Sequence, residues 1–462
     1  MTVEFRLAKH LILCYIRLKI GLNMKEILRD IIIEFHKSEL PALIPRDISI
    51  AQLPEDVRKA FVFIGMRRVG KTYLMYQDIH QKIRQGIAKE KILYINFEDD
   101  RLSRFTVDDF QTILDVYFQL YPQFADARDL SFYFDEIHNI PGWEKFIRRL
   151  LDKEKMHLFI TGSSAKLLSK EIATNLRGRC IEQEVFPLSI SEYLTHQGIT
   201  ERTRFTSKEK AAIQHYTEHY LKRGGFPETL ELVDSMQLQI IQTYVNSCVF
   251  RDVIDRYQLS NPHIIKMFLI HCLQNLASPL SVTKVYNTFK SRGEELTRSH
   301  LYEYLDHFED AYLVCSVPIF DFSTRKRQVN PSKIYCVDTG IITSYSMKPA
   351  TLYSTRLENA VYLELRRMRP EHIFYHKTKS GKEVDFVAQY PNGKIDLFQV
   401  SVDVQDEKTR KRELEAIIEA ASEFDIKDAY IITTDSKETV EVGSLTIRIL
   451  PYWEWAIGAH DI

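Results

Sequence analysis

The sequence predicts an α/β protein in which a parallel sheet is followed by a helical region and then by a second α/β segment. Three observations carry this prediction. Short apolar runs alternate with helical patterns up to about residue 176, which is typical of a parallel sheet. Helical periodicity then dominates 185–314, and strand-like runs return after residue 380. A chain of 462 residues is long enough for about two to four domains.

The same patterns set the expected domain boundaries. The predicted parts are an N-terminal helical extension (1–42), a parallel-sheet core (43–184), a helical lid or connector (185–260), a domain of three helices and a hairpin (261–345) and a C-terminal α/β domain (346–462).

Composition excludes some classes of protein. The net charge is −1, so no overall field directs the chain to nucleic acid or to a membrane, and any basic patch must be local. The six cysteines are scattered and form no C-x-x-C pair. This pattern argues against a zinc site or a disulfide framework and favours a reducing, cytoplasmic compartment.

The N-terminal stretch 10–22 is apolar but short, and it carries Arg17 and Lys19. It does not fit a membrane span, so we expect no membrane partner. A strong helical pattern begins at Met24. Residues 1–23 are either an extension from an upstream start codon or an ordinary amphipathic helix.

The octet GMRRVGKT (65–72) fits the phosphate-binding pattern G-x-x-x-x-G-K-[ST]. Glycines let a loop turn its backbone N–H groups towards phosphate, and the following helix offers its positive N-terminal end. An apolar strand (60–65) precedes the octet and a helix (71–86) follows it, as the motif requires. The expected phosphate-binding residues are Gly65, Arg67, Arg68, Val69, Gly70, Lys71, Thr72 and Tyr73.

These residues have separate expected roles towards ATP and Mg²⁺. Lys71 is expected at the β- and γ-phosphates, and the Thr72 hydroxyl at the metal ion. A second strand pattern, LSFYFDEIHNI (130–140), ends in Asp135 and Glu136. Asp135 would hold the metal ion, and Glu136 would orient and polarise the attacking water. Because parallel strands bind ligands at their carboxyl ends, the sequence predicts one site at this edge.

The strand pattern 157–165 ends in hydroxyl side chains at Thr161, Ser163 and Ser164. We expect Ser163 to sense the γ-phosphate or to position the water. The alternative is a cap for the following helix, and both roles can coexist. Arg177 and Arg179 follow in the segment LRGR. Either could neutralise charge on the transferred phosphoryl group, within its own chain or from a neighbouring copy in a homo-oligomer. The alternative is an arginine pair that faces solvent.

The region after residue 261 predicts three helices, 262–277, 281–293 and 297–314, followed by a β-hairpin with a basic turn (323–330). This is the order of a winged helix. The recognition helix would begin at Arg298, and the wing would present charges to phosphates. Protein contact is the open alternative, because the same helix is acidic further along. The expected wing contacts are Arg325, Lys326 and Arg327.

In the last domain, Glu358 on a helix and Asp385 on a strand fit the acids of a metal-dependent nuclease. The pattern also needs E-x-K on the next strand, where this chain has Gln399-Val400-Ser401. Lys382 or Lys408 could in principle supply the missing ammonium group. A degenerate core kept for binding is the favoured interpretation, and a working nuclease is the alternative.

Taken together, the motifs resemble a prokaryotic family of AAA-type ATPases with a C-terminal winged helix and a restriction-endonuclease-like fold. The resemblance covers residues 24 to about 455. It implies that Lys71 and Thr72 bind ATP with Mg²⁺, that Asp135 holds the metal ion and that Glu136 is the catalytic residue. The matching segments are LPALIPRDI, GMRRVGKT, YINFEDD, YFDEIHNI, ITGSSA, LRGR, FPLSISEYL, GGFPE, VFRDVIDRY, YCVDTG, LEN and EVDFV.

Three functions compete. The first is an ATP-hydrolysing switch that acts on DNA or on a DNA-bound partner. The second is a nucleotide-dependent signalling ATPase whose C-terminal half binds proteins. The third is an ATP-gated nuclease, which rests on Glu358 and Asp385 alone.

Overall fold

The structure is a computed structural model of the whole chain. It divides into two compact units, one that ends at Val185 and one that runs from Phe186 to the C-terminus, with residues 66–69 grouped with the second unit. The structure describes residues 24–458 except for 51, 52, 55, 56, 128, 155, 163–175, 177, 201–204, 322 and 347–351.

The first unit is built on a sheet of five parallel strands in the order β2-β3-β4-β1-β5. The first four strands coincide with the predicted apolar runs, but β5 was not predicted. It pairs with β1 at the edge of the sheet, and its sequence, CIEQE, in which no residue is fully buried, gives only a weak apolar signal. The strands are β1 Ala60–Ile64, β2 Ile92–Asn96, β3 Leu130–Asp135, β4 Met156–Gly162 and β5 Cys180–Glu184.

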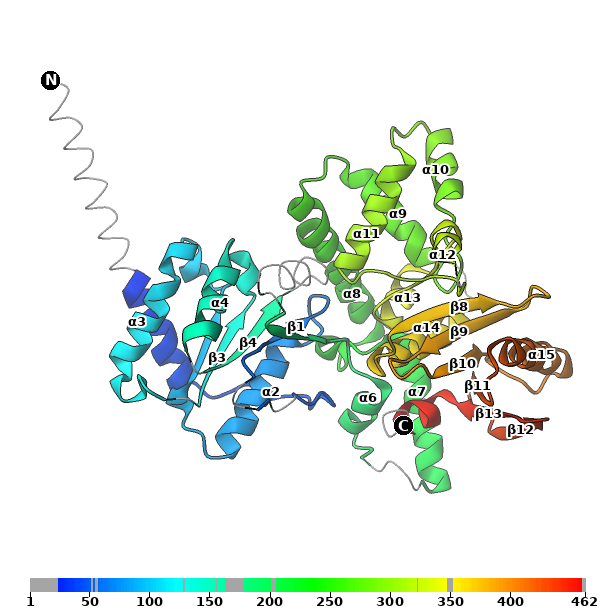
Figure 1. Cartoon of the computed structure of the whole chain (residues 1–462), viewed down its shortest axis with the longest axis horizontal. Coiled ribbons are helices and arrows are strands. Elements are labelled where there is room, and N and C mark those ends of the chain that lie inside the picture. The colour runs from blue at the N-terminus through cyan, green and yellow to red at the C-terminus, as the bar shows by residue number, and fades with distance from the viewer. Residues whose placement is uncertain are drawn as a thin grey trace. The chain divides into compact units, whose positions relative to one another are not determined.

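Helices cover both faces of this sheet (Figure 1). From β1 the chain moves through α2 to β2, and then it returns through α3 and α4. Right-handed crossovers therefore place α2 on the face opposite to α3 and α4. The helices are a segment over 24–37, α2 Lys71–Arg84, α3 Phe110–Leu120 and α4 Trp143–Lys153, with 3₁₀ turns η1 Lys89–Lys91, η2 Asp100–Leu102, η3 Val107–Asp109, η4 Pro122–Phe124 and η5 Ile137–Asn139.

The second unit begins with helices, as expected. One of them ends in a π-helix, η7, where the sequence predicts a single amphipathic helix over 243–259. The elements are α6 Ile190–His196, α7 Ser207–Arg223, η6 Pro227–Thr229, α8 Asp234–Cys248, η7 Val249–Asp255, α9 Pro262–Gln274, α10 Val282–Ser291, α11 Arg298–Asp310, α12 Thr324–Val329 and α13 Thr339–Tyr345.

The expected hairpin after α11 is present, but its turn is not a simple loop. Strands β6 Cys315–Val317 and β7 Lys333–Tyr335 pair antiparallel. The basic segment between them forms the short helix α12, which Ser323 caps by accepting the N–H of Lys326. The prediction of a basic turn was therefore wrong in its local structure, because a serine cap and helix-compatible residues favour a helical turn there.

A mixed sheet of six strands, in the order β12-β13-β11-β10-β9-β8, forms the rest of this unit. The predicted hairpin of β9 and β10 is confirmed, and so is the helix over 407–424. The elements are α14 Leu352–Arg367, β8 His372–Lys377, β9 Glu383–Gln389, β10 Ile395–Val400, α15 Glu407–Phe424, β11 Asp428–Thr433, β12 Glu438–Val442, β13 Leu445–Pro451 and α16 Tyr452–Gly458.

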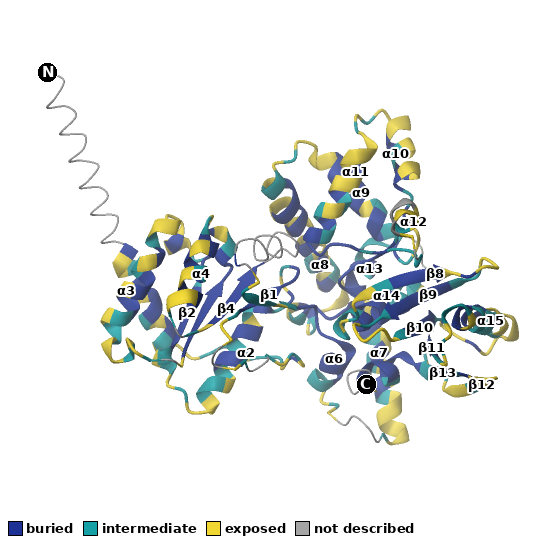
Figure 2. Ribbon diagram, viewed as in Figure 1, coloured by how far each residue is buried: buried dark blue, intermediate teal, exposed yellow. Residues whose placement is uncertain are grey.

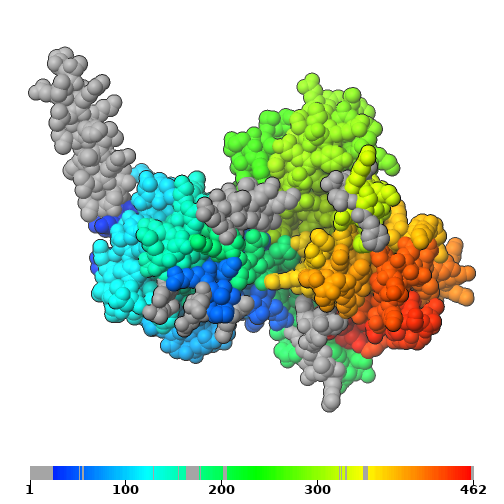
Figure 3. Space-filling model, viewed as in Figure 1, coloured from blue at the N-terminus to red at the C-terminus, as the bar shows by residue number. Residues whose placement is uncertain are grey.

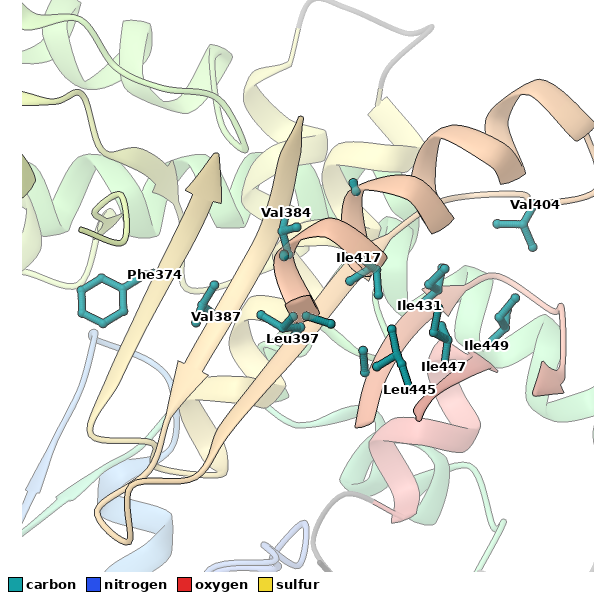
Figure 4. Close-up of a cluster of buried hydrophobic side chains, with 14 residues drawn as sticks. Phe374, Val384, Val387, Leu397, Val404, Ile417, Ile431, Leu445, Ile447 and Ile449 are labelled. Atoms are coloured by element: carbon teal, nitrogen blue, oxygen red, sulfur yellow. The ribbon is translucent and has the colours of Figure 1, made fainter. Parts of the chain in front are cut away.

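The two faces of this sheet carry separate apolar layers. One face packs on α15, where Leu397, Ile431 and Ile447 meet Ile417 (Figure 4). On the other face, the Phe386 ring lies near Tyr362 of α14, and Phe398 lies near Trp455 of α16. Because α14 is buried on almost all sides, it is a core helix. Figure 2 shows the central strands of both large sheets buried, whereas β12 and α10 are largely exposed.

A segment that follows β6 protects one edge of the six-stranded sheet. Ile319 forms a parallel bridge with Tyr375 of β8. The Phe320 N–H donates to the Tyr375 carbonyl oxygen at 2.6 Å, and the Tyr375 N–H donates to the Pro318 carbonyl oxygen at 3.0 Å. The hairpin region and the sheet thus adjoin, within the part of the second unit that Figure 3 colours from yellow-green to red.

The GGFPE and YCVDTG segments meet in a tight backbone contact. Asp338 accepts the N–H of Gly225 at 2.7 Å and that of Gly340 at 2.8 Å. A Cβ at Gly225 would lie 2.3 Å from the Leu188 carbonyl oxygen, and one at Gly224 would lie 1.9 Å from Asp338. The glycines are therefore required for close approach of three chain segments.

None of the helices within the described residues is both long enough and apolar enough to cross a lipid bilayer.

Candidate nucleotide-binding site

The octet 65–72 links β1 to α2 in the way a phosphate-binding loop requires. Gly65, Arg68 and Gly70 all have positive φ angles, of 153°, 68° and 99°. Gly70 stands at the N-cap of α2, where no side chain caps the helix and no acidic residue lies in the first turn. The helix N-terminus can therefore offer its N–H groups and its positive dipole end to an anion.

Lys71 is the first residue of α2, and its side chain is buried. Its ammonium group donates to the Gly65 carbonyl oxygen at 3.1 Å. The same nitrogen lies 4.0 Å from Oε1 of Glu136. Lys71 therefore spans the two motifs that the sequence analysis assigned to one site.

Three hydroxyl groups surround the carboxylate of Asp135 at the end of β3. The hydroxyl groups of Thr72 and Tyr94 each donate to Oδ2 at 2.8 Å. The Thr161 hydroxyl, from β4, donates to Oδ1. Burial and the nearby charge of Glu136 raise the pKa of Asp135, while the three hydroxyl groups favour the ionised form and oppose that rise.

Glu136 is held in an unusual backbone conformation directly after β3. Its φ angle is 52°, in the left-handed region. Its N–H donates to the Thr161 hydroxyl at 2.8 Å, and its Oε2 lies 3.3 Å from Nδ1 of His138. A non-glycine residue in this region costs about 1 kcal/mol or more and persists where surrounding contacts hold it. These contacts fix the direction of a buried acid.

The remaining expected residues of the loop and of α2 also make contacts with other parts of the chain. Among the loop residues grouped with the second unit, Arg67 pairs with Asp252 at 2.8 Å, and Arg68 is exposed and lies 3.5 Å from Glu228. Val69 is buried. Tyr73, in α2, is half exposed and contacts the Tyr76 ring.

Of the two candidate arginines, only Arg179 is described, since Arg177 and Ser163 lie outside the described residues. Arg179 directly precedes β5 and pairs with Asp152, and its carbonyl oxygen accepts the N–H of Ala60 at the start of β1. The phosphate-binding loop follows the other end of β1. Arg179 therefore lies at the amino ends of the parallel strands, whereas the loop lies at their carboxyl ends.

Sequence reasoning missed two contributors to the site, Tyr94 and His138. Tyr94 lies in β2, next to β3, two residues before the Asn96 position that pairs with Asp135. In a sequence, an aromatic residue within a buried strand is interpreted as part of the hydrophobic core. Only the pairing of β2 with β3 reveals that the Tyr94 hydroxyl contacts Asp135. His138 follows Glu136 by two residues, but the left-handed turn that brings it close was not predictable.

The C-terminal acids Glu358 and Asp385 do come together. Each lies about a hydrogen bond from the Lys333 ammonium group, at 3.0 and 2.9 Å. Of the two lysines proposed from sequence, Lys382 pairs with Glu415 of α15 at 3.0 Å, and Lys408 is exposed on α15.

Comparison with known proteins agrees with this geometry. Residues 57–194 match the model of an AAA domain, and residues 214–351 and 355–455 match two domains of unknown function, DUF8612 and DUF4143. The loop, the buried acids and this match define the first unit as an AAA-type P-loop ATPase domain.

The whole chain also has full-length relatives. It is 34% identical over 426 residues to the uncharacterized protein MJ1544 of Methanocaldococcus jannaschii, covering 90% of this chain and 91% of the relative. The chain belongs to the same family as that protein. It is 29% identical over 417 residues to an uncharacterized protein of Haemophilus influenzae, covering 89% and 98%.

Among solved structures, the Walker-type ATPase PABY2304 of Pyrococcus abyssi aligns with a TM-score of 0.42 and 13% identity. The alignment covers 62% of this chain and 90% of that one.

Proposed function

We propose that the first unit binds ATP with Mg²⁺ and hydrolyses it. The observation that carries this proposal is the 2.8 Å hydrogen bond between the Thr72 hydroxyl and Asp135. It joins the loop motif to the acid motif, which lie far apart in the sequence, at the carboxyl edge of the parallel sheet. This hydroxyl and this carboxylate are oxygen ligands that suit Mg²⁺.

Each residue has a distinct task in this proposal. Thr72 and Asp135 would hold the metal ion, which neutralises charge on the phosphates. The N–H groups at the start of α2 and the Lys71 ammonium would bind the β- and γ-phosphates. Glu136 would accept a hydrogen bond from the attacking water and so orient it towards phosphorus. Thr161 keeps both acids in place.

We do not assign the role of phosphate contact to Arg179 of the same chain, because that residue lies at the amino ends of the parallel strands and the phosphate-binding loop lies at their carboxyl ends. Within this proposal, Arg177 or an arginine from a neighbouring copy would fill the role. An arginine that acts from a neighbouring copy makes hydrolysis depend on protein concentration.

The test is ATP turnover by the wild type and by Glu136→Gln. We expect the substitution to reduce the hydrolysis rate about 100-fold or more while ATP binding remains, because the amide cannot polarise water as the carboxylate does. Glu90→Gln, an exposed change in the same unit, is the matched control. Equal turnover in Glu136→Gln and in the control would refute the assignment.

We further propose that the second unit uses the nucleotide state to act on DNA, through a winged-helix arrangement of α9, α10, α11 and the β6–β7 hairpin. The exposed N-terminal residues of α11, Arg298 and His300, support this role. So do the exposed side chains of Arg325 and Lys326 on α12. The fourth candidate, Arg327, is half-buried and lies over the Phe374 ring at 5.6 Å, so we assign it to packing.

Binding to a protein is the second candidate. It is favoured by the acids Glu303 and Asp306, which are exposed on α11. Acidic side chains on a recognition helix would repel the phosphate backbone, whereas a basic protein surface would attract them.

Salt dependence separates these two candidates. If α12 contacts phosphates, duplex DNA binding should weaken steeply with salt, and the double variant Arg325→Ala/Lys326→Ala should reduce the slope of log K against log salt by about 2. The double variant Lys408→Ala/Lys411→Ala on α15 is the control. Weak binding with the same slope in all three proteins would favour a protein partner.

A further inference from the structure

The second unit contains a buried cation surrounded by acids. The Lys333 ammonium on β7 lies 3.0 Å from Oε1 of Glu358, 2.9 Å from Oε1 of Glu383 and 2.9 Å from Oδ1 of Asp385. The lysine side chain is only 2% exposed. An ammonium group has three hydrogens, so three carboxylates can satisfy it completely.

The acids in this cluster come from different elements. Glu358 belongs to α14, and Glu383 and Asp385 belong to β9, whereas Lys333 belongs to the hairpin before them. Three carboxylates from two elements thus converge on one point, and the group at that point is a protein side chain.

Other protein groups also bind oxygens of this cluster, including Oε1 of Glu358, the oxygen that faces Lys333. The Tyr335 hydroxyl donates to Glu358 at 2.7 Å, and the Val400 N–H donates to Oδ2 of Asp385 at 3.0 Å. Gln399, which stands where the nuclease pattern has an acid, accepts the N–H of Asp385 at 3.3 Å and donates to Glu413 at 2.7 Å. Gln399 therefore links the backbone of β9 to the side chain of Glu413 on α15.

The charge balance shows why a cation is needed at this point. Burial and the nearby Asp385 charge raise the pKa of Glu358, whereas Lys333 and the Tyr335 hydroxyl act in the opposite direction. The three carboxylates together raise the pKa of Lys333 against the effect of burial, so the lysine stays charged. Removal of one partner from a buried ion cluster leaves uncompensated charge, which is strongly destabilising.

We propose that Lys333 is the resident cation of this site and occupies the place that a divalent metal ion would take. The carboxylate set has the hard oxygen chemistry that Mg²⁺ and Mn²⁺ prefer. The Lys333 ammonium group fills the point on which the carboxylates converge, 2.9–3.0 Å from an oxygen of each, so a metal ion, which needs oxygens at about 2.0–2.1 Å, cannot bind there while the lysine stays in place. The site therefore holds the hairpin to α14 and β9, and it does not support metal-dependent cleavage of nucleic acid.

The test uses the protein in the absence of nucleotide. If the ammonium replaces a metal ion, its removal should create a metal site. In Lys333→Ala we expect a loss of thermal stability in EDTA and a saturable rise of Tm with MnCl2, by about 4 °C or more at a hundredfold excess over Kd. The wild type should show no Mn²⁺-dependent rise of Tm beyond that of Glu358→Gln.

The matched control is Lys333→Ala/Glu358→Gln, which lacks one of the three acids. It isolates the site, because Mn²⁺ bound anywhere else on the protein contributes equally to both variants. The Mn²⁺-dependent rise of Tm should be lost or reduced at least about tenfold in apparent affinity. A Lys333→Ala protein that folds and gives no Mn²⁺ response beyond that of this control would overturn the proposal.

A second measurement covers the case in which Lys333→Ala does not fold. Electron paramagnetic resonance counts free Mn²⁺ during titration of the wild type and of Glu358→Gln. Equal binding by both proteins supports a site closed by Lys333. A saturable Mn²⁺ site in the wild type that Glu358→Gln abolishes would show that metal enters despite the lysine, and the proposal would be wrong.

Discussion

One hydroxyl group organises both acids of the nucleotide site. The Thr161 hydroxyl donates to Asp135 and accepts the N–H of Glu136, so it sets the direction of the first acid and the backbone of the second. A polar group this deeply buried is costly without its partners. Thr161 is therefore a positioning residue in the proposed reaction, because it acts on the phosphates only through Asp135 and Glu136.

Substitution of Thr161 tests this arrangement. Thr161→Val keeps the shape but leaves the Glu136 N–H without its acceptor, so we expect a loss of about 1–3 kcal/mol in the free energy of unfolding, together with reduced ATP turnover. Thr161→Ser keeps the hydroxyl and should recover most of both. Urea denaturation and steady-state turnover provide the measurements, and equal behaviour of the two variants would contradict the role.

A second residue, Asp338, makes stability depend on pH. Burial raises its pKa from 3.8 to about 7, although the N–H groups of Gly225 and Gly340 favour the ionised form. The folded protein thus binds a proton that the unfolded chain releases. The stability contribution is fully present below about pH 4 and is lost as pH rises through about 7, by up to about 4 kcal/mol.

The substitution Asp338→Asn removes this titration. Between about pH 4.5 and about pH 8, we expect the free energy of unfolding to decline less in the variant than in the wild type. Urea denaturation at several pH values provides the measurement. Because Glu358 also has a raised pKa, the informative quantity is the difference between the two slopes. Parallel profiles would show that Asp338 does not titrate in this range.

At the scale of elements, the sequence predicted those whose signal is local. The strand, loop and helix around the octet, the strand that ends in Asp135, and the β9–β10 hairpin each carry their own periodicity or turn residues. β5 and β12 were missed because an edge strand is largely exposed or half-buried and lacks a clear apolar run. β8 was also missed, although three of its residues are buried. The sequence paired Glu358 with Asp385, but it missed Lys333 between them, because only the folded chain brings the hairpin to α14 and β9.

The two glycines that follow α7 allow the segments before α6 and before α13 to approach closely. A Cβ on Gly225 would meet backbone atoms of Leu188, which cannot move aside as a flexible side chain can. We expect Gly225→Ala to lower the free energy of unfolding by about 3 kcal/mol or more. Gly458→Ala, where a Cβ meets nothing within 4 Å, is the control, and denaturant titration compares the two. Similar stability of both variants would contradict the requirement for close approach.

At the scale of the whole molecule, the described cysteines report on the two units separately. Cys180 lies in the first unit, whereas Cys248, Cys272, Cys315 and Cys336 are buried in the second. Burial raises the pKa of Cys180 to about 11, so its thiol is poorly reactive near neutral pH.

Pulsed thiol labelling with mass spectrometry should therefore measure unfolding. We expect Cys272 in α9 and Cys336 after β7 to label at the same rate, because the Lys333 cluster and the hairpin join the three helices to the sheet. Lys333→Ala should let Cys272 label faster than Cys336. Different rates in the wild type would show that the three helices open on their own.

The segment 318–320 along β8 has a consequence for synthesis of the chain. A free edge of a sheet can pair with the strands of other molecules, and nascent proteins are exposed to this hazard while they are incomplete. Here the covering segment precedes β8 in the sequence, so it leaves the ribosome first. Once β8 pairs with β9, its outer edge has a cover that the chain has already made, and the opposite edge strand, β12, emerges with the repelling charges of Glu438 and Glu441.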